Sequence, residues 1–91
     1  MWQKGKVIKS TAEHMNGKII WVRGKPEILE GIGIFERKIR RPTPAYETNL
    51  LSRDGSDVFV RQEVMELLGA EDAFCEEIEK VPFEEWSREV K

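Results

Sequence analysis

The stretch 16-NGKIIWVRGKPEILEGIGIF-35 decides the fold. It opens on an Asn-Gly turn, continues through the strand-forming run 19–22, and breaks at residues 24–27 before a second β-branched run reaches Phe35. Strong strand formers bounded by strong turn formers predict a β-meander. We therefore expect the residues before this stretch to supply a partner strand and the residues after it to close and cover the sheet.

The segment before this stretch contains a candidate first strand within residues 2–10, followed by a helix-capping pattern. In a capping box, Ser10 would accept from the amide of Glu13, and Glu13 would reach back to the amide of Ser10. One helical turn through Met15, stopped by Asn16-Gly17, is then expected. The alternative pairs residues 11–15 with 18–22 across a two-residue Asn-Gly hairpin, but residues 11–14 lack an apolar alternation, so the helical turn is favoured.

Residues 18–23 are expected to form a central strand. Their apolar run does not alternate, which predicts burial on both faces, as in a closed or covered barrel. The next run carries Gly31 and Gly33, which share one face of a strand and leave it bare. Such a face permits the sharp bend that a small barrel needs at its corners, or alternatively the close approach of a ligand or partner backbone.

Residues 49–60 predict a hairpin closed by an Asp-Gly type I′ turn. A two-residue loop would place Leu51 opposite Val58 and Leu50 opposite Phe59. Asp54 is explained by this turn and no third ligand accompanies Asp57, so we expect no metal site here.

The C-terminal part predicts short covering elements. Residues 61–68 suit a helical turn or a final strand ended by Gly69. Residues 70–81 then predict an amphipathic helix whose apolar stripe consists of Ala70, Ala73, Phe74, Ile78 and Val81. Pro82 suits the first position of a last short helix, which carries Phe83, Trp86 and Val90 on one side.

Together these elements predict a mainly β fold with C-terminal helices. Its architecture is similar to a five-strand, SH3-like half-open barrel or meander capped by one or two short helices. Residues 1–68 would form the barrel, and residues 69–91 an acidic amphipathic tail that packs on the barrel or on a partner. A chain of 91 residues makes one domain at most.

Composition excludes several classes of protein. The chain is 40% hydrophobic and 35% charged, as expected of a globular protein with a charged surface. It has no apolar run long enough for a transmembrane helix and no signal-peptide pattern, so we expect a cytoplasmic protein without membrane contact. A single cysteine, Cys75, excludes an internal disulfide and a cysteine-based zinc site, and it is expected to be a small apolar residue on a helix face.

The net charge of −2 conceals a division along the chain. Residues 1–62 contain 12 Lys and Arg against 7 Asp and Glu, whereas residues 63–91 contain 3 against 10. This asymmetry indicates either a polyanionic partner for the basic part or an acidic tail that neutralises it. Candidate phosphate contacts are Lys18, Arg23, Lys25, Arg37, Lys38, Arg40 and Arg41. Trp21 or Tyr46 would be available for base stacking.

Catalytic and cofactor-binding patterns are absent from the sequence. His14 is the only histidine and has no marked nucleophile beside it. No phosphate-binding loop occurs, and Gly31-Ile32-Gly33 lacks the third glycine of a dinucleotide fingerprint. We therefore expect a non-enzymatic protein without a cofactor or metal.

Two functions remain from the sequence alone. The favoured one is a protein-interaction or assembly subunit that binds a partner or a second copy through Phe74, Ile78, Phe83 and Trp86. The alternative is a nucleic-acid-binding module that uses the basic loop 37–41 and nearby aromatic side chains. The first is favoured because the dense glutamates of the tail weaken the attraction of polyanions beyond a Debye length of about 8–10 Å.

Overall fold

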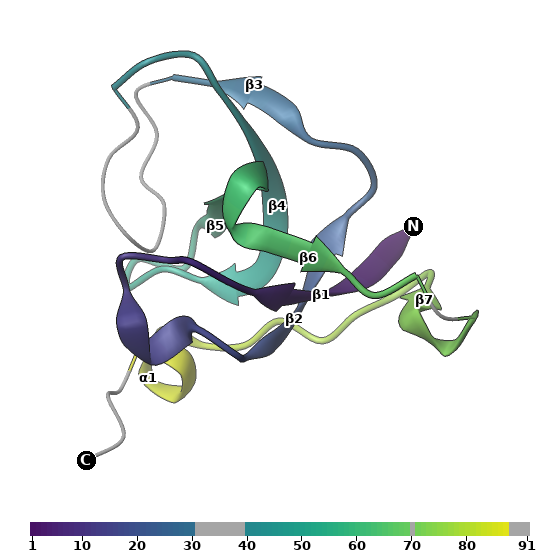
Figure 1. The fold of residues 1–91 in the computed structure, drawn as a ribbon. Helices are drawn as coiled ribbons and strands as arrows, with labels where there is room; N and C mark the ends of the chain where they lie inside the picture. Colours follow the sequence, from purple (N-terminus) through teal and green to yellow (C-terminus); the bar gives the residue numbers. More distant parts are fainter. Residues whose placement is uncertain (31–39, 70, 88–91) are drawn as a thin grey trace.

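The computed structural model describes residues 1–30, 40–69 and 71–87. A curled antiparallel sheet forms a half-barrel around one core, and one short helix lies near the C-terminus (Figure 1). The strands are β1 (Trp2–Val7), β2 (Ile19–Arg23), β3 (Glu27–Leu29), β4 (Thr43–Leu51), β5 (Asp57–Arg61), β6 (Met65–Leu67) and β7 (Phe74–Cys75). The helix α1 covers Phe83–Trp86. The mainly β class is therefore confirmed, but the described residues form seven strands rather than five, because very short strands complete the sheet edges.

The sheet is built on two strands that each have several partners. β4 pairs with β3, β2 and β5, while β1 pairs with β2, β6 and β7. Between β5 and β6, the 3-10 turn η2 (Gln62–Val64) redirects the chain, and the Ile8 amide donates to the Val64 carbonyl at 2.7 Å. Residues 61–68 thus contain both the helical turn and the final strand that their sequence suggested. This turn brings the end of the meander back to β1 and curls the sheet.

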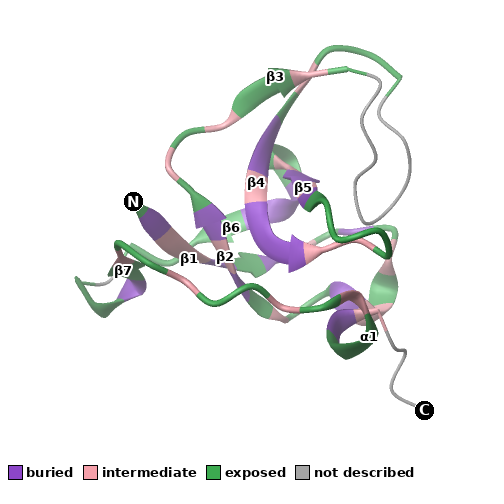
Figure 2. Cartoon of the chain, turned by 180° about the vertical axis from the view of Figure 1, so that it is seen from behind, coloured by how far each residue is buried: buried purple, intermediate pink, exposed green. Residues whose placement is uncertain are grey.

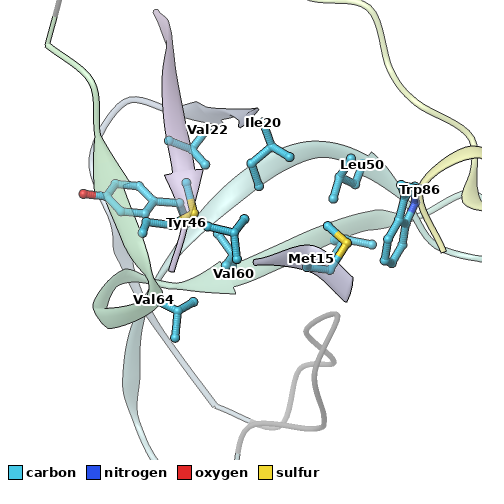
Figure 3. Close-up of a cluster of buried hydrophobic side chains, with 11 residues drawn as sticks. Met15, Ile20, Val22, Tyr46, Leu50, Val60, Val64 and Trp86 are labelled. Atoms are coloured by element: carbon cyan, nitrogen blue, oxygen red, sulfur yellow. The ribbon is translucent and has the colours of Figure 1, made fainter. Parts of the chain in front are cut away.

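The core lies inside the curl and includes α1 (Figure 3). Its buried side chains are Val7, Met15, Ile20, Val22, Tyr46, Leu50, Val58, Val60, Val64, Met65 and Trp86. On β2, Ile20 and Val22 are buried, whereas Ile19 is 49% exposed and Trp21 is half-buried. The prediction of equal burial on both faces of β2 is therefore wrong, because only one face of this strand meets the core.

The segment between β1 and β2 forms the predicted helical turn, the 3-10 element η1 (Glu13–Met15). The alternative hairpin is wrong, since β2 pairs with β1 instead. The capping box is also wrong: the Ser10 hydroxyl accepts from the amide of Ala12 at 3.0 Å, not from Glu13. Asn16 closes the loop, because its side chain accepts from the Ser10 amide and donates to the Ser10 carbonyl.

The β4–β5 hairpin exists, but its predicted register is wrong. Leu51 lies opposite Asp57 rather than Val58, and a β-bulge separates this pair from the pairing of Glu47 with Phe59. The Gly55 amide donates to the Ser52 carbonyl and the Ser52 amide to the Ser56 carbonyl. These bonds define a three-residue loop. Gly55 has a φ of +87°, but Asp54 does not have the positive φ that a type I′ turn also requires.

The predicted helix over residues 70–81 is wrong. The 3-10 turn η3 (Glu71–Ala73) leads into β7, which pairs with Trp2 and Gln3 of β1. Residues 76–81, here called the strap, then run without helix from β7 to the end of β4, where Val81 bridges Leu50 (Figure 2). Hydrogen bonds from outside the segment outcompete a short helix, whose formation is marginal without packing. The Val81 amide donates to the Asn49 carbonyl, and the Leu51 amide donates to the Val81 carbonyl.

The last predicted helix is confirmed as α1, although Pro82 occupies its N-cap rather than its first helical position. In the described part of the tail, Val81 and Phe83 pack against the core and Trp86 belongs to it. Several sequence-based predictions concern Gly31, Gly33, Phe35, Arg37, Lys38, Ala70 and Val90, which lie outside the described residues.

Candidate nucleic-acid interface

β1 and β2 present a face that points away from the core. Side chains alternate across a strand, so Val7, Ile20 and Val22 point inward while their neighbours point outward. Residues paired directly across the two strands share a face. The outer face, as we name it, consists of the pairs Trp2 with Arg23, Lys4 with Trp21 and Lys6 with Ile19. Each pair joins one cation to one large apolar side chain.

Cations lie against the aromatic rings of this face. The Lys4 ammonium nitrogen lies 5.3 Å from the Trp21 ring centroid, and the Arg23 guanidinium carbon lies 5.7 Å from that of Trp2. Such contacts are attractive because the ring face carries negative potential. Trp21 is half-buried, while Lys6, Ile19 and Arg23 are exposed, so all three pairs reach solvent.

The positive charge of the barrel comes mainly from this part of the chain. Residues 1–25 contain six Lys and Arg against one Glu, whereas residues 26–62 contain six against six. The excess therefore belongs to β1, β2 and their flanking turns rather than to the basic loop predicted from residues 37–41. Within that loop, Arg40 and Arg41 are exposed. Arg37 and Lys38 lie outside the described residues.

The strap borders the outer face. Cys75, immediately before it, pairs with Trp2 on β1, and the Lys80 ammonium nitrogen lies 4.9 Å from the Trp2 ring centroid. Asn49 anchors the strap: its side chain accepts from the Trp21 amide at 3.2 Å and donates to the Glu79 carbonyl at 3.1 Å. Trp2 is only 7% exposed as a result of this cover, so its ring is not open for stacking.

A pocket of about 280 Å³ adjoins the Arg23 end of the outer face. Its lining residues are Met1, Arg23, Gly24, Lys25, Glu27 and Glu47. The Arg23 guanidinium contacts the Glu47 carboxylate at 3.3 Å. The β2–β3 turn shapes the pocket through Gly24, whose φ is +47° and whose amide donates to the Met1 carbonyl. Glu27 and Glu47 were not predicted as site residues from the sequence, because the pairing of Glu27 with Ala45, which shares a face with Glu47, depends on the register of β3 with β4.

The other candidates for phosphate or base contact are dispersed. Lys25 is exposed and lines the pocket, and Lys18 is half-buried just before β2. Tyr46 is 4% exposed and belongs to the core, so its ring does not reach the surface. The structure thus brings Arg23, Lys25 and Trp21 into one region and leaves Tyr46 apart from it.

The four residues predicted for partner binding are divided between core and surface. Trp86 is 7% exposed and Phe83 is half-buried, and their rings meet edge to face at a centroid distance of 5.4 Å. The Arg53 guanidinium covers Phe83 at 5.0 Å. Ile78 is half-buried in the strap, while Phe74 is 43% exposed on β7. These side chains do not form one stripe, since the helix that would have aligned them is absent.

Phe74 instead lies on the edge of β1, beside exposed leucines that follow β5 along the chain. Leu67 pairs with Gly5 and Phe74 with Gln3, which places both along the same strand. Leu67 and Leu68 are each 40% exposed. These three side chains, Leu67, Leu68 and Phe74, are here called the apolar edge.

The remaining polar groups give no second site in the described residues. Cys75 is half-buried on β7 rather than on a helix, and its thiol donates to the Glu77 carbonyl. The His14 Nε2 atom is buried without a hydrogen-bond partner among the described residues. In the described ranges no three His, Cys, Asp or Glu side chains gather as metal ligands, and no helix is long and apolar enough to cross a membrane.

No protein-family model matches the chain, and neither the curated proteins nor the solved structures contain a significant match. The arrangement of its own residues therefore carries the functional argument.

Proposed function

We propose that this chain is a small single-stranded nucleic-acid-binding module whose contact surface is the outer face. The observation that carries the proposal is the register of β1 with β2, which sets a cation beside an apolar side chain in each of the three pairs of the outer face. Nucleic-acid strands need both groups, because phosphates attract Lys and Arg while unpaired bases stack on flat or apolar side chains. Pairs on one face repeat about every 7 Å along the strands.

The shape of this surface favours single strands over duplexes. Trp21 is half-buried and Ile19 is exposed on a sheet, where they can meet bases only if these are unstacked. The α1 helix has four residues and is too short to fill a major groove of about 12 Å width. A sheet surface with interleaved cations and apolar side chains is the common solution for unpaired strands.

The overall charge of −2 does not oppose this proposal, because the charges are segregated along the chain. Exposed charges farther apart than about 8 Å are largely screened at physiological ionic strength. Lys4, Lys6 and Arg23 act locally on phosphates at the outer face, while the glutamates of the strap lower the long-range attraction. We expect modest affinity with a strong dependence on salt.

The proposal includes two finer expectations, an SH3-like barrel and a cytoplasmic location. The pairing of β6 with β1 after the turn η2 curls the sheet into a half-barrel and supports the first. A fold of this kind hosts nucleic-acid, peptide and assembly functions, so the argument for function rests on the outer face and not on the fold.

Fluorescence anisotropy with labelled single-stranded DNA, RNA and duplex DNA between 50 and 200 mM salt tests the proposal. We expect Lys4→Ala with Lys6→Ala to weaken binding to every single strand and to lower the salt slope by about 2. Arg40→Ala with Arg41→Ala removes the same charge from the end of the basic loop and is the matched control. Absence of binding at low salt, or an equal effect of both double variants, contradicts the outer face as the contact surface.

A second candidate function is the protein-interaction or assembly role that the sequence analysis favoured. The apolar edge supports it, because three large apolar side chains remain 40–43% exposed along one strand. Grouped apolar exposure of this kind is typical of protein contacts. Sedimentation analysis of the wild type and of Phe74→Ser tests this candidate. A monomer at all concentrations that captures no protein partner contradicts it.

A further inference from the structure

We infer that the pocket beside the outer face binds a guanine base, so that the chain reads one base of the strand it contacts. This inference rests on the proposed nucleic-acid function and deepens it. Arg23 belongs both to the outer face and to the pocket lining, so a strand that follows the outer face reaches the pocket at its end. The volume of about 280 Å³ is near the lower end of ligand sites, as suits a single base.

The pocket is lined by two acidic and two basic side chains. Glu27 and Glu47 supply carboxylate acceptors, and Arg23 and Lys25 supply donors. Only one Glu47 oxygen contacts Arg23, and the other has no hydrogen-bond partner in the described part of the chain. Glu27 and Lys25 likewise form no ion pair with another described residue. These groups are therefore available to a ligand.

The backbone amide and carbonyl of Gly24 already have hydrogen-bond partners, so we assign the recognition to the side chains around it. The Gly24 amide donates to the Met1 carbonyl, and the Gly24 carbonyl accepts from the Gln3 side chain at 2.6 Å. These two bonds hold the β2–β3 turn against the start of β1. Gly24 is thus held against β1, and the side chains of Arg23, Lys25 and Glu27 project from the backbone around it.

Among the bases, guanine matches this set of groups best. Its N1–H and N2–H₂ donors lie side by side and can meet one carboxylate, while its O6 and N7 acceptors suit Arg or Lys. Adenine and cytosine place a ring acceptor beside their single amino group, which would oppose a second carboxylate oxygen. Thymine and uracil flank their one N–H with carbonyl oxygens, which would oppose the second oxygen of the same carboxylate.

The Arg23–Glu47 ion pair also prepares the pocket for such a base. The Glu47 side chain is 21% exposed while that of Arg23 is 62% exposed, so the carboxylate is held in place and the guanidinium remains accessible. A guanidinium can accommodate both partners because it carries five N–H donors. Guanine would thus contact both members of the pair at the same time.

Anisotropy with labelled nine-residue thymidine oligonucleotides tests the inference, with the central base replaced by guanine, adenine, cytosine or hypoxanthine. We expect the guanine strand to bind roughly tenfold more tightly than all-thymidine, and hypoxanthine, which lacks the N2 amino group, to lose most of this gain. Glu47→Gln and Glu27→Gln should reduce the ratio of guanine to all-thymidine affinity, whereas the loss of negative charge alone should change the affinity for both strands by the same factor. Glu13→Gln, an exposed carboxylate outside the pocket, is the matched control for charge.

The outcomes separate this inference from the proposed function. Equal binding of all strands overturns the guanine pocket but leaves the outer face as a binding surface. A preference for guanine that survives both Glu27→Gln and Glu47→Gln also overturns it, since the base is then read elsewhere. If no strand binds, the pocket and the proposed function both fail.

Discussion

The indole Nε1–H of Trp86 donates a hydrogen bond of 2.8 Å to the carbonyl oxygen of Leu51, which ties α1 to the end of β4. Trp86 is 7% exposed and packs in the core, so it stabilises the fold through both apolar contact and this bond. We expect Trp86→Phe to lower the free energy of unfolding by about 1–2 kcal/mol, because the Leu51 carbonyl loses its indole donor. Trp86→Ala should cost about 3–5 kcal/mol.

Urea denaturation measures both effects on Trp86. Phe74→Leu changes an exposed aromatic side chain and serves as the control, with an expected effect within about 0.5 kcal/mol. A Trp86→Phe variant as stable as the wild type would show that the bond to Leu51 adds nothing.

Asn49 holds the strap beside the outer face, and its removal should loosen that segment. The side chain is 5% exposed and bonds both the Trp21 amide and the Glu79 carbonyl. Asn49→Ala leaves these groups unpaired, and we expect a loss of about 2 kcal/mol. Trypsin should also cut faster after Lys80, since the strap opens more often. Cleavage at the wild-type rate would contradict Asn49 as its anchor.

Asp54 should contribute to stability in a defined range of pH. Hydrogen bonds from the Ser52 hydroxyl, and then from the Ser56 hydroxyl and amide, lower the pKa of Asp54 from 3.8 to about 2. A lowered carboxyl pKa stabilises the fold above the unfolded pKa, and this contribution is lost as the pH falls through the folded pKa. The stability difference between the wild type and Asp54→Asn should thus be constant above about pH 5 and shrink between about pH 4 and 2.

Denaturation of both proteins at a series of pH values checks this prediction for Asp54. The other carboxylates are common to the two chains and cancel in the difference. A difference that does not change down to pH 2 would mean that the Ser52 and Ser56 bonds do not favour the ionised form.

The glutamates of the strap should oppose binding at the outer face. Glu76 and Glu77 are exposed and follow Cys75, the partner of Trp2. We expect Glu76→Gln with Glu77→Gln to tighten single-strand binding several-fold at 50 mM salt and less at 200 mM, where screening is stronger. Glu84→Gln with Glu85→Gln makes the same charge change on α1. If both double variants act equally in anisotropy, net charge rather than the position of the strap is responsible.

Local signals in the sequence predicted the elements that depend on local chemistry. The turn η1, strand β2, the Asp54-Gly55 hairpin and α1 all arise from neighbouring residues, and each is present. The register of the hairpin was missed because the Asp-Gly pair favours a two-residue loop. The hydrogen bonds of Asp54 with Ser52 and Ser56 instead stabilise a three-residue loop.

Residues 70–81 show where local signals fail. Their apolar spacing suits a helix, yet Trp2 and Gln3 offer a strand edge more than 70 residues earlier in the chain, and pairing with that edge outcompetes the helix. The outer face could be anticipated in part, since Trp2, Lys4 and Lys6 alternate along one strand. The sequence does not reveal the register of β1 with β2. It therefore does not show which residue of β2 lies opposite Trp2, Lys4 or Lys6.

Because β1 pairs with strands that are made much later, the sheet can close only late in synthesis. This strand is synthesised before β6 and β7, which border it on one side and whose residues are made tens of positions later. Until they emerge, β1 presents unpaired backbone and apolar side chains such as Val7, a state that favours aggregation and recruits chaperones. The core is therefore incomplete until Trp86 is made, and slow translation of the codons between β2 and Trp86 would prolong that interval.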